Sequence, residues 1–190
     1  MRCPRLKDLP SPPHGKKGWP WTEETPPLPD AMPNGRPWPR ISIVTPSYNQ
    51  AEFIEETIRS VLLQGYPDIE YIIIDGGSTD GSVEIIKKYE PWLTYWVSEP
   101  DSGQTNALNK GFKKATGEIL NWLNSDDIFL PGAFTTIAKK YIEFPKAGAF
   151  VGGTYRVSAK GKLLMTVLPR DLSLDGIATV SYTHLTLPTN

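Results

Sequence analysis

From Arg40 onward, short apolar runs alternate with stretches whose apolar residues recur at helical spacing. The run at residues 41–45 is β-branched, as a buried strand requires, and Ile54, Ile58 and Val61 then mark one face of a helix that stops near Gly65. The same pattern predicts strands at residues 69–74, 93–97, 118–123, 150–157 and 163–168, and helices around residues 83–87, 104–115 and 131–144. This order predicts an α/β fold with a mostly parallel sheet and helices on both faces.

The residues before this pattern have a different composition. Residues 1–39 contain eleven prolines, which remove backbone donors and restrict their neighbours, so a helix or an inner strand is excluded there. We interpret this N-terminal segment as a leader or linker, extended in part, that adds little to the core. Trp19, Trp21 and Trp38 are unusual in a linker, and they leave open that the segment docks onto the domain or onto a partner.

Polar stretches rich in small residues follow each of the first four predicted strands of the domain. They are residues 45–49, 75–81, 99–104 and 124–127. In open parallel sheets, ligands bind beyond the carboxyl ends of the strands. The four stretches are therefore expected to meet at one edge of the sheet and to form one cleft.

Asp126 and Asp127 are the strongest indication of a binding site at this edge. Adjacent carboxylates directly after a buried strand repel each other and lose solvation, and a hard divalent cation removes that penalty. Magnesium or manganese is commonly held by one or two carboxylates together with substrate phosphates. The alternative interpretation is that the pair caps a helix or a turn.

Other residues of the predicted cleft have two interpretations each. Asp75 can accept a hydrogen bond from a base or a ribose, or it can form an N-cap or an Asx turn. Gly76 lets a ligand approach the backbone closely, and Tyr48 can stack on a base or pack at the rim. The stretches contain neither a G-x-G-x-x-G string nor a Walker A loop, which disfavours a dinucleotide or a P-loop site.

Four strings in this order resemble family 2 glycosyltransferases of the GT-A fold. They are Ile41-Ser42-Ile43-Val44-Thr45-Pro46-Ser47-Tyr48-Asn49, Ile73-Ile74-Asp75-Gly76-Gly77-Ser78-Thr79-Asp80-Gly81-Ser82, Glu99-Pro100-Asp101-Ser102-Gly103-Gln104 with Asn106-Ala107-Leu108-Asn109-Lys110-Gly111, and Trp122-Leu123-Asn124-Ser125-Asp126-Asp127. The resemblance covers about residues 40–155. It implies a Rossmann-like GT-A sheet, a nucleotide-diphosphate sugar donor that is often UDP-linked, and a Mn²⁺ or Mg²⁺ cofactor.

The resemblance also assigns residues to the donor site. The nucleotide-sugar contacts that it implies are Thr45, Pro46, Tyr48, Asn49, Asp75, Gly76, Gln104, Asn124 and Ser125, with the first three lining the base pocket and Asp75 reading the base. The family's Asp-any-Asp metal motif falls on Asn124-Ser125-Asp126, so Asp126 is the expected metal ligand, with Asp127 beside it. Asn124 stands where the family carries an acid, and Gly76 stands where many members carry a second acid.

The resemblance implies that the metal offsets charge on the departing diphosphate and that a carboxylate base deprotonates the acceptor hydroxyl, with inversion at the sugar. Asp171 and Asp175 are the only acids after Glu143, and neither lies in the acidic motif that normally supplies the base. We therefore expect a partial domain at residues 40–179, incomplete at its C-terminal side and inactive alone. Residues 180–190 resemble a translated sequencing adapter, with an edge strand as the alternative.

Charge and composition limit the binding partners and the cellular location that can be expected for this chain. The net charge of -1 disfavours nucleic acid, and a single cysteine, Cys3, fits a cytosolic location. No apolar run is long enough to cross a bilayer, although peripheral contact with the inner face of a membrane stays open. The family resemblance implies a saccharide or a lipid-linked molecule as the acceptor, as in polysaccharide biosynthesis. Two rival functions remain: a nucleotidyltransferase, although residues 45–50 lack a basic residue, and a nucleotide-sugar-binding module without catalysis.

Overall fold

Residues 1–158 and 162–168 are described by the structure, a computed structural model of the chain. The chain falls into two compact units, Met1–Phe144 and Pro145–Asn190. The C-terminal residues to which the sequence predictions refer, namely Asp171, Asp175 and the adapter-like residues 180–190, lie outside the described residues.

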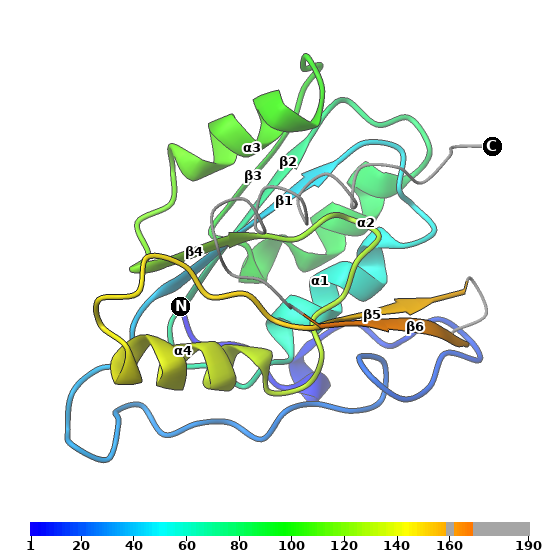
Figure 1. The fold of residues 1–190 in the computed structure, drawn as a ribbon. Helices are drawn as coiled ribbons and strands as arrows, with labels where there is room; N and C mark the ends of the chain where they lie inside the picture. Colours follow the sequence, from blue (N-terminus) through cyan, green and yellow to red (C-terminus); the bar gives the residue numbers. More distant parts are fainter. Residues whose placement is uncertain (159–161, 169–190) are drawn as a thin grey trace. The chain divides into compact units, whose positions relative to one another are not determined.

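The first unit is built on a parallel sheet of four strands in the order β3-β2-β1-β4 (Figure 1). Its strands are β1 (Ile41–Ser47), β2 (Ile69–Asp75), β3 (Tyr95–Ser98) and β4 (Ile119–Trp122), and its helices are α1 (Ile54–Leu62), α2 (Ser82–Tyr89), α3 (Gln104–Phe112) and α4 (Ala133–Glu143), with 3-10 turns η1 (Leu6–Asp8) and η2 (Glu90–Trp92). The predicted α/β fold is confirmed. The last helix begins at Ala133 rather than at Pro131, because Gly132 before it has a left-handed φ of 76°.

Alternate residues of the central strands face two separate parts of the core. Ile43 and Ile73 pack with α1, α2 and α4 on one side, whereas Val44 and Ile72 pack with α3 on the other. Figure 1 shows α3 across the sheet from α1 and α2. A Cβ atom on Gly111 would lie 2.3 Å from Cγ1 of Val44, so only glycine lets α3 approach β1 this closely.

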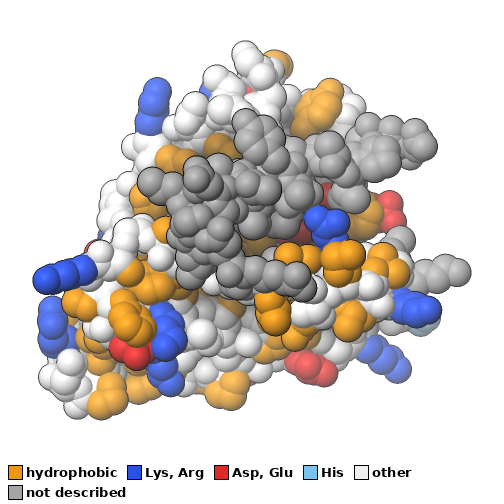
Figure 2. All heavy atoms as spheres, viewed as in Figure 1, with side chains coloured by type: hydrophobic (Ala, Val, Ile, Leu, Met, Phe, Trp, Pro, Cys, Tyr) orange, Lys and Arg blue, Asp and Glu red, His pale blue; other side chains and the backbone are white. Residues whose placement is uncertain are grey.

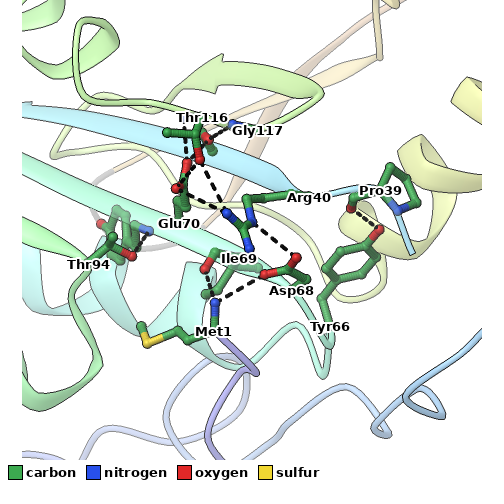
Figure 3. A network of polar contacts seen from close by, with 12 residues as sticks. Met1, Pro39, Arg40, Tyr66, Asp68, Ile69, Glu70, Thr94, Thr116 and Gly117 are labelled. Atoms are coloured by element: carbon green, nitrogen blue, oxygen red, sulfur yellow. Dashed lines mark hydrogen bonds and ion pairs between the residues drawn. The ribbon is translucent and has the colours of Figure 1, made fainter. Parts of the chain in front are cut away.

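A polar network ties the amino ends of the strands together (Figure 3). The carboxylate of the buried Glu70 accepts hydrogen bonds from the Ser42 hydroxyl at 2.5 Å and from the Thr116 backbone N–H at 2.7 Å. Burial works to raise the pKa of Glu70, but these hydrogen bonds and the charge of Arg40 outweigh it and hold the pKa below its ordinary value. Arg40 also pairs with Asp68 at 3.1 Å. The polar groups at the amino ends of the strands therefore pair with one another.

The prediction that the N-terminal segment adds little to the core is wrong. Six of its residues are buried: Cys3, Leu9, Pro20, Trp21, Trp38 and Pro39. Proline keeps the segment out of strands and long helices, as predicted, but its backbone groups find partners elsewhere. The N–H groups of Cys3 and Thr25 donate to the carbonyls of Tyr66 and Leu63, each at 2.9 Å. An irregular segment can be buried once its polar backbone groups are satisfied in this way.

The second unit contains an antiparallel hairpin of β5 (Thr154–Val157) and β6 (Leu163–Val167). Its large apolar side chains are exposed, and Figure 2 shows apolar side chains gathered over these two strands. The exposed residues are Tyr155, Val157, Leu163, Leu164 and Met165. An isolated two-stranded hairpin is marginal in water, so this apolar surface is suited to packing against another surface. No helix within the described ranges is both long and apolar enough to cross a membrane.

Candidate nucleotide-sugar site

The carboxyl ends of the strands meet at one edge of the sheet, as the sequence predicts. Ser47 of β1 lies opposite Asp75 of β2, and Asp75 lies opposite Ser98 of β3. On the other side of β1, Val44 lies opposite Trp122, the last residue of β4. The four polar stretches therefore leave the sheet at the same edge.

The loops after β1 and β2 are joined through Asn49. Its backbone N–H donates to the hydroxyl of Ser78 at 2.8 Å, and its side-chain oxygen accepts the N–H of Thr79 at 2.9 Å. Asn49 has a φ of 51°, a left-handed conformation that asparagine tolerates better than most residues. Tyr48 before it is 62% exposed, so the ring lies free at the rim rather than packed into it.

A second link between these loops runs through Asp80. Its carboxylate accepts the N–H of Ala51 at 2.9 Å and the hydroxyl of Ser82 at 2.6 Å. Partial burial works to raise the pKa of Asp80, but these hydrogen bonds prevail and hold the pKa below its ordinary value. The two loops are thus fixed relative to each other before any ligand binds.

Asp75 is fully buried, and both of its carboxylate oxygens are engaged. Oδ2 accepts the N–H groups of Gly77 and Ser78 at 3.1 and 2.9 Å and the hydroxyl of Ser98 at 2.7 Å, while Oδ1 accepts the hydroxyl of Ser78 at 2.5 Å. The bond to Gly77, two residues on, forms the Asx turn that the sequence offered as an alternative. Asp75 thereby shapes the loop after β2 and joins it to β3.

Gly76 lies directly against the loop after β3. A Cβ atom at this position would come within 3.3 Å of both carboxylate oxygens of Asp101. One of those oxygens accepts the N–H of Gly103 at 2.7 Å, at the start of α3. The missing side chain at Gly76 therefore makes room for Asp101, a half-buried carboxylate at the rim that the sequence did not single out.

A chain of side chains connects α3 to the loop after β4. Gln104 donates to the side-chain oxygen of Asn124 at 2.7 Å, and Asn124 donates to Oδ2 of Asp127 at 3.0 Å. Asp126 and Asp127 are both exposed. Asp126 makes no hydrogen bond or ion pair with the described part of the chain. The predicted metal ligand is therefore accessible, and the carboxylate beside it is oriented by Asn124.

The backbone of the Asp126 loop is held by a polar stripe that was not predicted from the sequence, made of Thr57 and Ser60 of α1 and of Gln64 just after the helix. Thr57 donates to the carbonyls of Ser125 and Asp127 at 2.9 and 2.8 Å, and Gln64 donates to that of Leu130 at 3.1 Å. Ser60, between them on α1, accepts the N–H of Phe129 at 3.2 Å. The stripe is buried although it is polar. Its spacing of three and four residues, one helix face, was the available signal.

Three residues at the end of β1 are buried under the rim. Thr45 is fully buried, with its hydroxyl 3.2 Å from that of Tyr71, and Pro46 is buried beside it. Ser47 is 4% exposed, and its hydroxyl has no hydrogen-bond partner among the described residues. A buried polar group without a partner is costly, and at the edge of a candidate site it marks a position that a ligand can satisfy.

These residues fit a divalent cation that takes most of its ligands from elsewhere. Within residues 1–158 and 162–168, no three histidine, cysteine or acidic side chains form a cluster able to hold a metal by themselves. Magnesium and manganese do not require such a cage, because they are bound by one or two carboxylates plus phosphates and water. The exposed pair Asp126 and Asp127 supplies that minimum.

Comparisons with known proteins agree with this geometry. The sequence model of the family described as Glycosyl transferase family 2 matches residues 42–177. An uncharacterised glycosyltransferase of Mycobacterium tuberculosis is 42% identical over 48% of this chain and 35% of its own length. TuaG of Bacillus subtilis, whose name assigns it to teichuronic acid biosynthesis, is 41% identical over 47% of this chain and 36% of its own length. The chain thus spans about a third of the length of these relatives.

Two solved structures share the fold. TarS of S. aureus covers 56% of this chain and 20% of its own, with a TM-score of 0.52 and 29% identity. The mannosyltransferase PcManGT of Pyrobaculum calidifontis, solved with GDP-Man and Mn²⁺, covers 72% of this chain and 39% of its own, with a TM-score of 0.50 and 28% identity.

Proposed function

Since the chain belongs to glycosyl transferase family 2, we propose that it forms the donor-binding part of an enzyme that transfers a sugar from a nucleotide-diphosphate sugar to an acceptor hydroxyl. One observation carries the proposal: the exposed carboxylates of Asp126 and Asp127 follow β4 at the edge where the loops after β1, β2 and β3 also end. Phosphates bound at this edge need a positive counter-charge, and a cation on these carboxylates provides it.

The nucleotide is bound by the loops after β1 and β2. Tyr48 is exposed and offers an aromatic face to a base. Thr45 and Pro46 form the floor beneath it, and the hydroxyl of Ser47 gains a partner when the ligand binds. Asp75 contributes chiefly by holding the backbone of Gly77 and Ser78, with Oδ1, which accepts a single bond, as the atom that a base N–H would reach.

The loop after β4 would hold the metal and the diphosphate. Asp126 would ligate Mn²⁺ or Mg²⁺, and Asp127 would supply a second carboxylate beside it. A bound cation would offset the negative charge that develops on the departing diphosphate. Gln104 and Asn124 keep Asp127 in place through their hydrogen bonds, and Ser125 fixes the turn through its carbonyl. The Mn²⁺ and GDP-Man bound to PcManGT support this assignment.

The finer features of the reaction follow the family pattern. We propose a UDP-linked donor, inversion at the sugar, and a saccharide or lipid-linked acceptor at the cytoplasmic side of a membrane. The similarity to TuaG supports a role in polysaccharide biosynthesis.

A binding experiment tests the proposal without requiring turnover. UDP, GDP and CDP are each added to the full chain with Mn²⁺ or with a chelator, and thermal unfolding is followed. A ligand present at 100 times its dissociation constant stabilises the folded state by about 2.7 kcal/mol. We expect that stabilisation only when nucleotide and Mn²⁺ are both present, and most strongly with UDP.

A matched pair of variants locates the metal. Asp126→Ala is expected to abolish the Mn²⁺ effect, whereas Glu118→Ala, which removes an exposed carboxylate at the amino end of the same strand, should keep it. A metal-dependent shift that persists in Asp126→Ala refutes the metal assignment. Equal stabilisation by nucleotide with and without metal points instead to a binding module that works without a cation.

A further inference from the structure

Arg59 of α1 holds the N-terminal segment, residues 1–39, against the rest of the first unit. The side chain is fully buried, yet within the described chain its guanidinium pairs with no carboxylate. It donates instead to the backbone carbonyls of Pro10 at 2.9 Å, Pro20 at 3.0 Å and Trp21 at 3.0 Å. Gly65 permits a second close approach, because a Cβ atom there would lie 2.6 Å from the Thr25 carbonyl.

The fastened segment reaches the loop that carries the two aspartates. The indole N–H of Trp19 donates to the carbonyl of Phe129 at 2.8 Å, and the hydroxyl of Thr25 accepts the N–H of Gly132 at 3.2 Å. Phe129 is two residues beyond Asp127. The backbone after the aspartates is therefore held both by the polar stripe of Thr57, Ser60 and Gln64 and by residues 19 and 25.

We propose that the N-terminal segment is a positioning element of the donor site, in which Trp19 and Thr25 fix the backbone that presents Asp126 and Asp127. Residues 1–39 lie outside the region matched by the family, residues 42–177, so this role is additional to the family's own site. It rests on the proposed function, because it assigns those aspartates to the metal. Side chains that orient metal ligands are a recognised determinant of metal affinity.

Two tryptophan variants separate positioning from general stability. Trp19→Phe removes the donor to Phe129 while keeping an aromatic ring. Trp38→Phe is the matched control, since the Trp38 indole donates to the carbonyl of Pro29 at 3.1 Å, within the N-terminal segment itself. Each variant of the full chain is examined by hydrogen exchange of residues 125–132, and Mn²⁺ affinity is measured in saturating UDP by electron paramagnetic resonance of the free ion.

We expect Trp19→Phe to speed exchange in residues 125–132 and to weaken Mn²⁺ binding about 3- to 10-fold, below the 10- to 100-fold effect of removing a partner that contacts a metal ligand directly. Trp38→Phe should leave both unchanged. Equal behaviour of the two variants overturns the inference alone, as does faster exchange in Trp19→Phe with unchanged Mn²⁺ affinity. Absence of Mn²⁺-dependent UDP binding in the unmodified chain overturns the proposed function, and the inference with it.

Discussion

Arg59→Met is the most informative perturbation of this fold, because it removes a buried cation that donates to three backbone carbonyls of the N-terminal segment and lies over the ring of Trp21. Methionine keeps an unbranched apolar stem but none of the donors. Hydrogen bonds from a charged donor contribute about 1.5–3 kcal/mol each, and Arg59 makes three to the segment. The sum overstates the loss, since released carbonyls can bind water. We expect a decrease of about 3–5 kcal/mol in the free energy of unfolding, which is below the sum of the three hydrogen bonds.

The single cysteine gives a direct assay for release of the segment. Cys3 is 4% exposed, and burial raises the pKa of its thiol to about 12, so it should react slowly with a thiol reagent in the folded chain. Urea unfolding measures the global change, and the labelling rate of Cys3 measures local opening. In Arg59→Met, the chain should unfold at a lower urea concentration, and Cys3 should be labelled faster.

Arg36→Met is the control, because Arg36 is an exposed arginine of the same segment whose side chain makes no hydrogen bond to the described residues. It should change stability by less than about 0.5 kcal/mol. A loss below about 1 kcal/mol in Arg59→Met, with Cys3 labelled no faster than in Arg36→Met, would refute the view that these carbonyl contacts hold the segment.

Further predictions concern three side chains of the sheet. Ser47→Ala should leave stability unchanged or raise it by about 1 kcal/mol, because it removes a buried hydroxyl that has no partner among the described residues. It should also weaken UDP binding in calorimetry, and tighter binding would contradict the assignment. Asp75→Asn should lower the free energy of unfolding by about 1–3 kcal/mol and weaken UDP binding together; weakened binding at unchanged stability would mean that Asp75 meets the base directly. The lowered pKa of Glu70 implies stability that is present above its unfolded pKa, about 4.3, and is lost as pH falls through the folded value. Acid unfolding curves should therefore be flatter in Glu70→Gln, and an unchanged acid limb would count against the network.

The regular elements of the first unit were predictable because their apolar periodicity is strong. β1 and β2 are buried at every position and are rich in isoleucine and valine, and α1 shows its apolar face at Ile54, Ile58 and Val61. The convergence of the four polar stretches followed from the parallel order alone. Neither inference required knowledge of how a side chain is bonded.

Packing of the N-terminal segment was not predictable by the same logic. Proline rules out regular structure but not burial, and it leaves every carbonyl free to accept a hydrogen bond. The partner, Arg59, lies within an amphipathic helix, where a cation is ordinarily assigned to the solvent side. The tryptophans were a real signal of docking, but without the position of Arg59 they did not distinguish a docked segment from a solvated one.

The hydrogen bonds that each aspartate accepts distinguish structural aspartates from ligand-binding ones at the carboxyl edge of the sheet. Asp75 accepts four hydrogen bonds from its own and the neighbouring loop, and Asp80 accepts bonds across the loops after β1 and β2. Asp126 is exposed and accepts none from the described residues, although its backbone is held through the neighbouring carbonyls of Ser125 and Asp127. A carboxylate whose main chain is fixed while its oxygens stay open is preorganised for a cation. The same sequence signal, an aspartate after a buried strand, therefore has opposite uses at Asp75 and at Asp126, and only the donors around each one distinguish them.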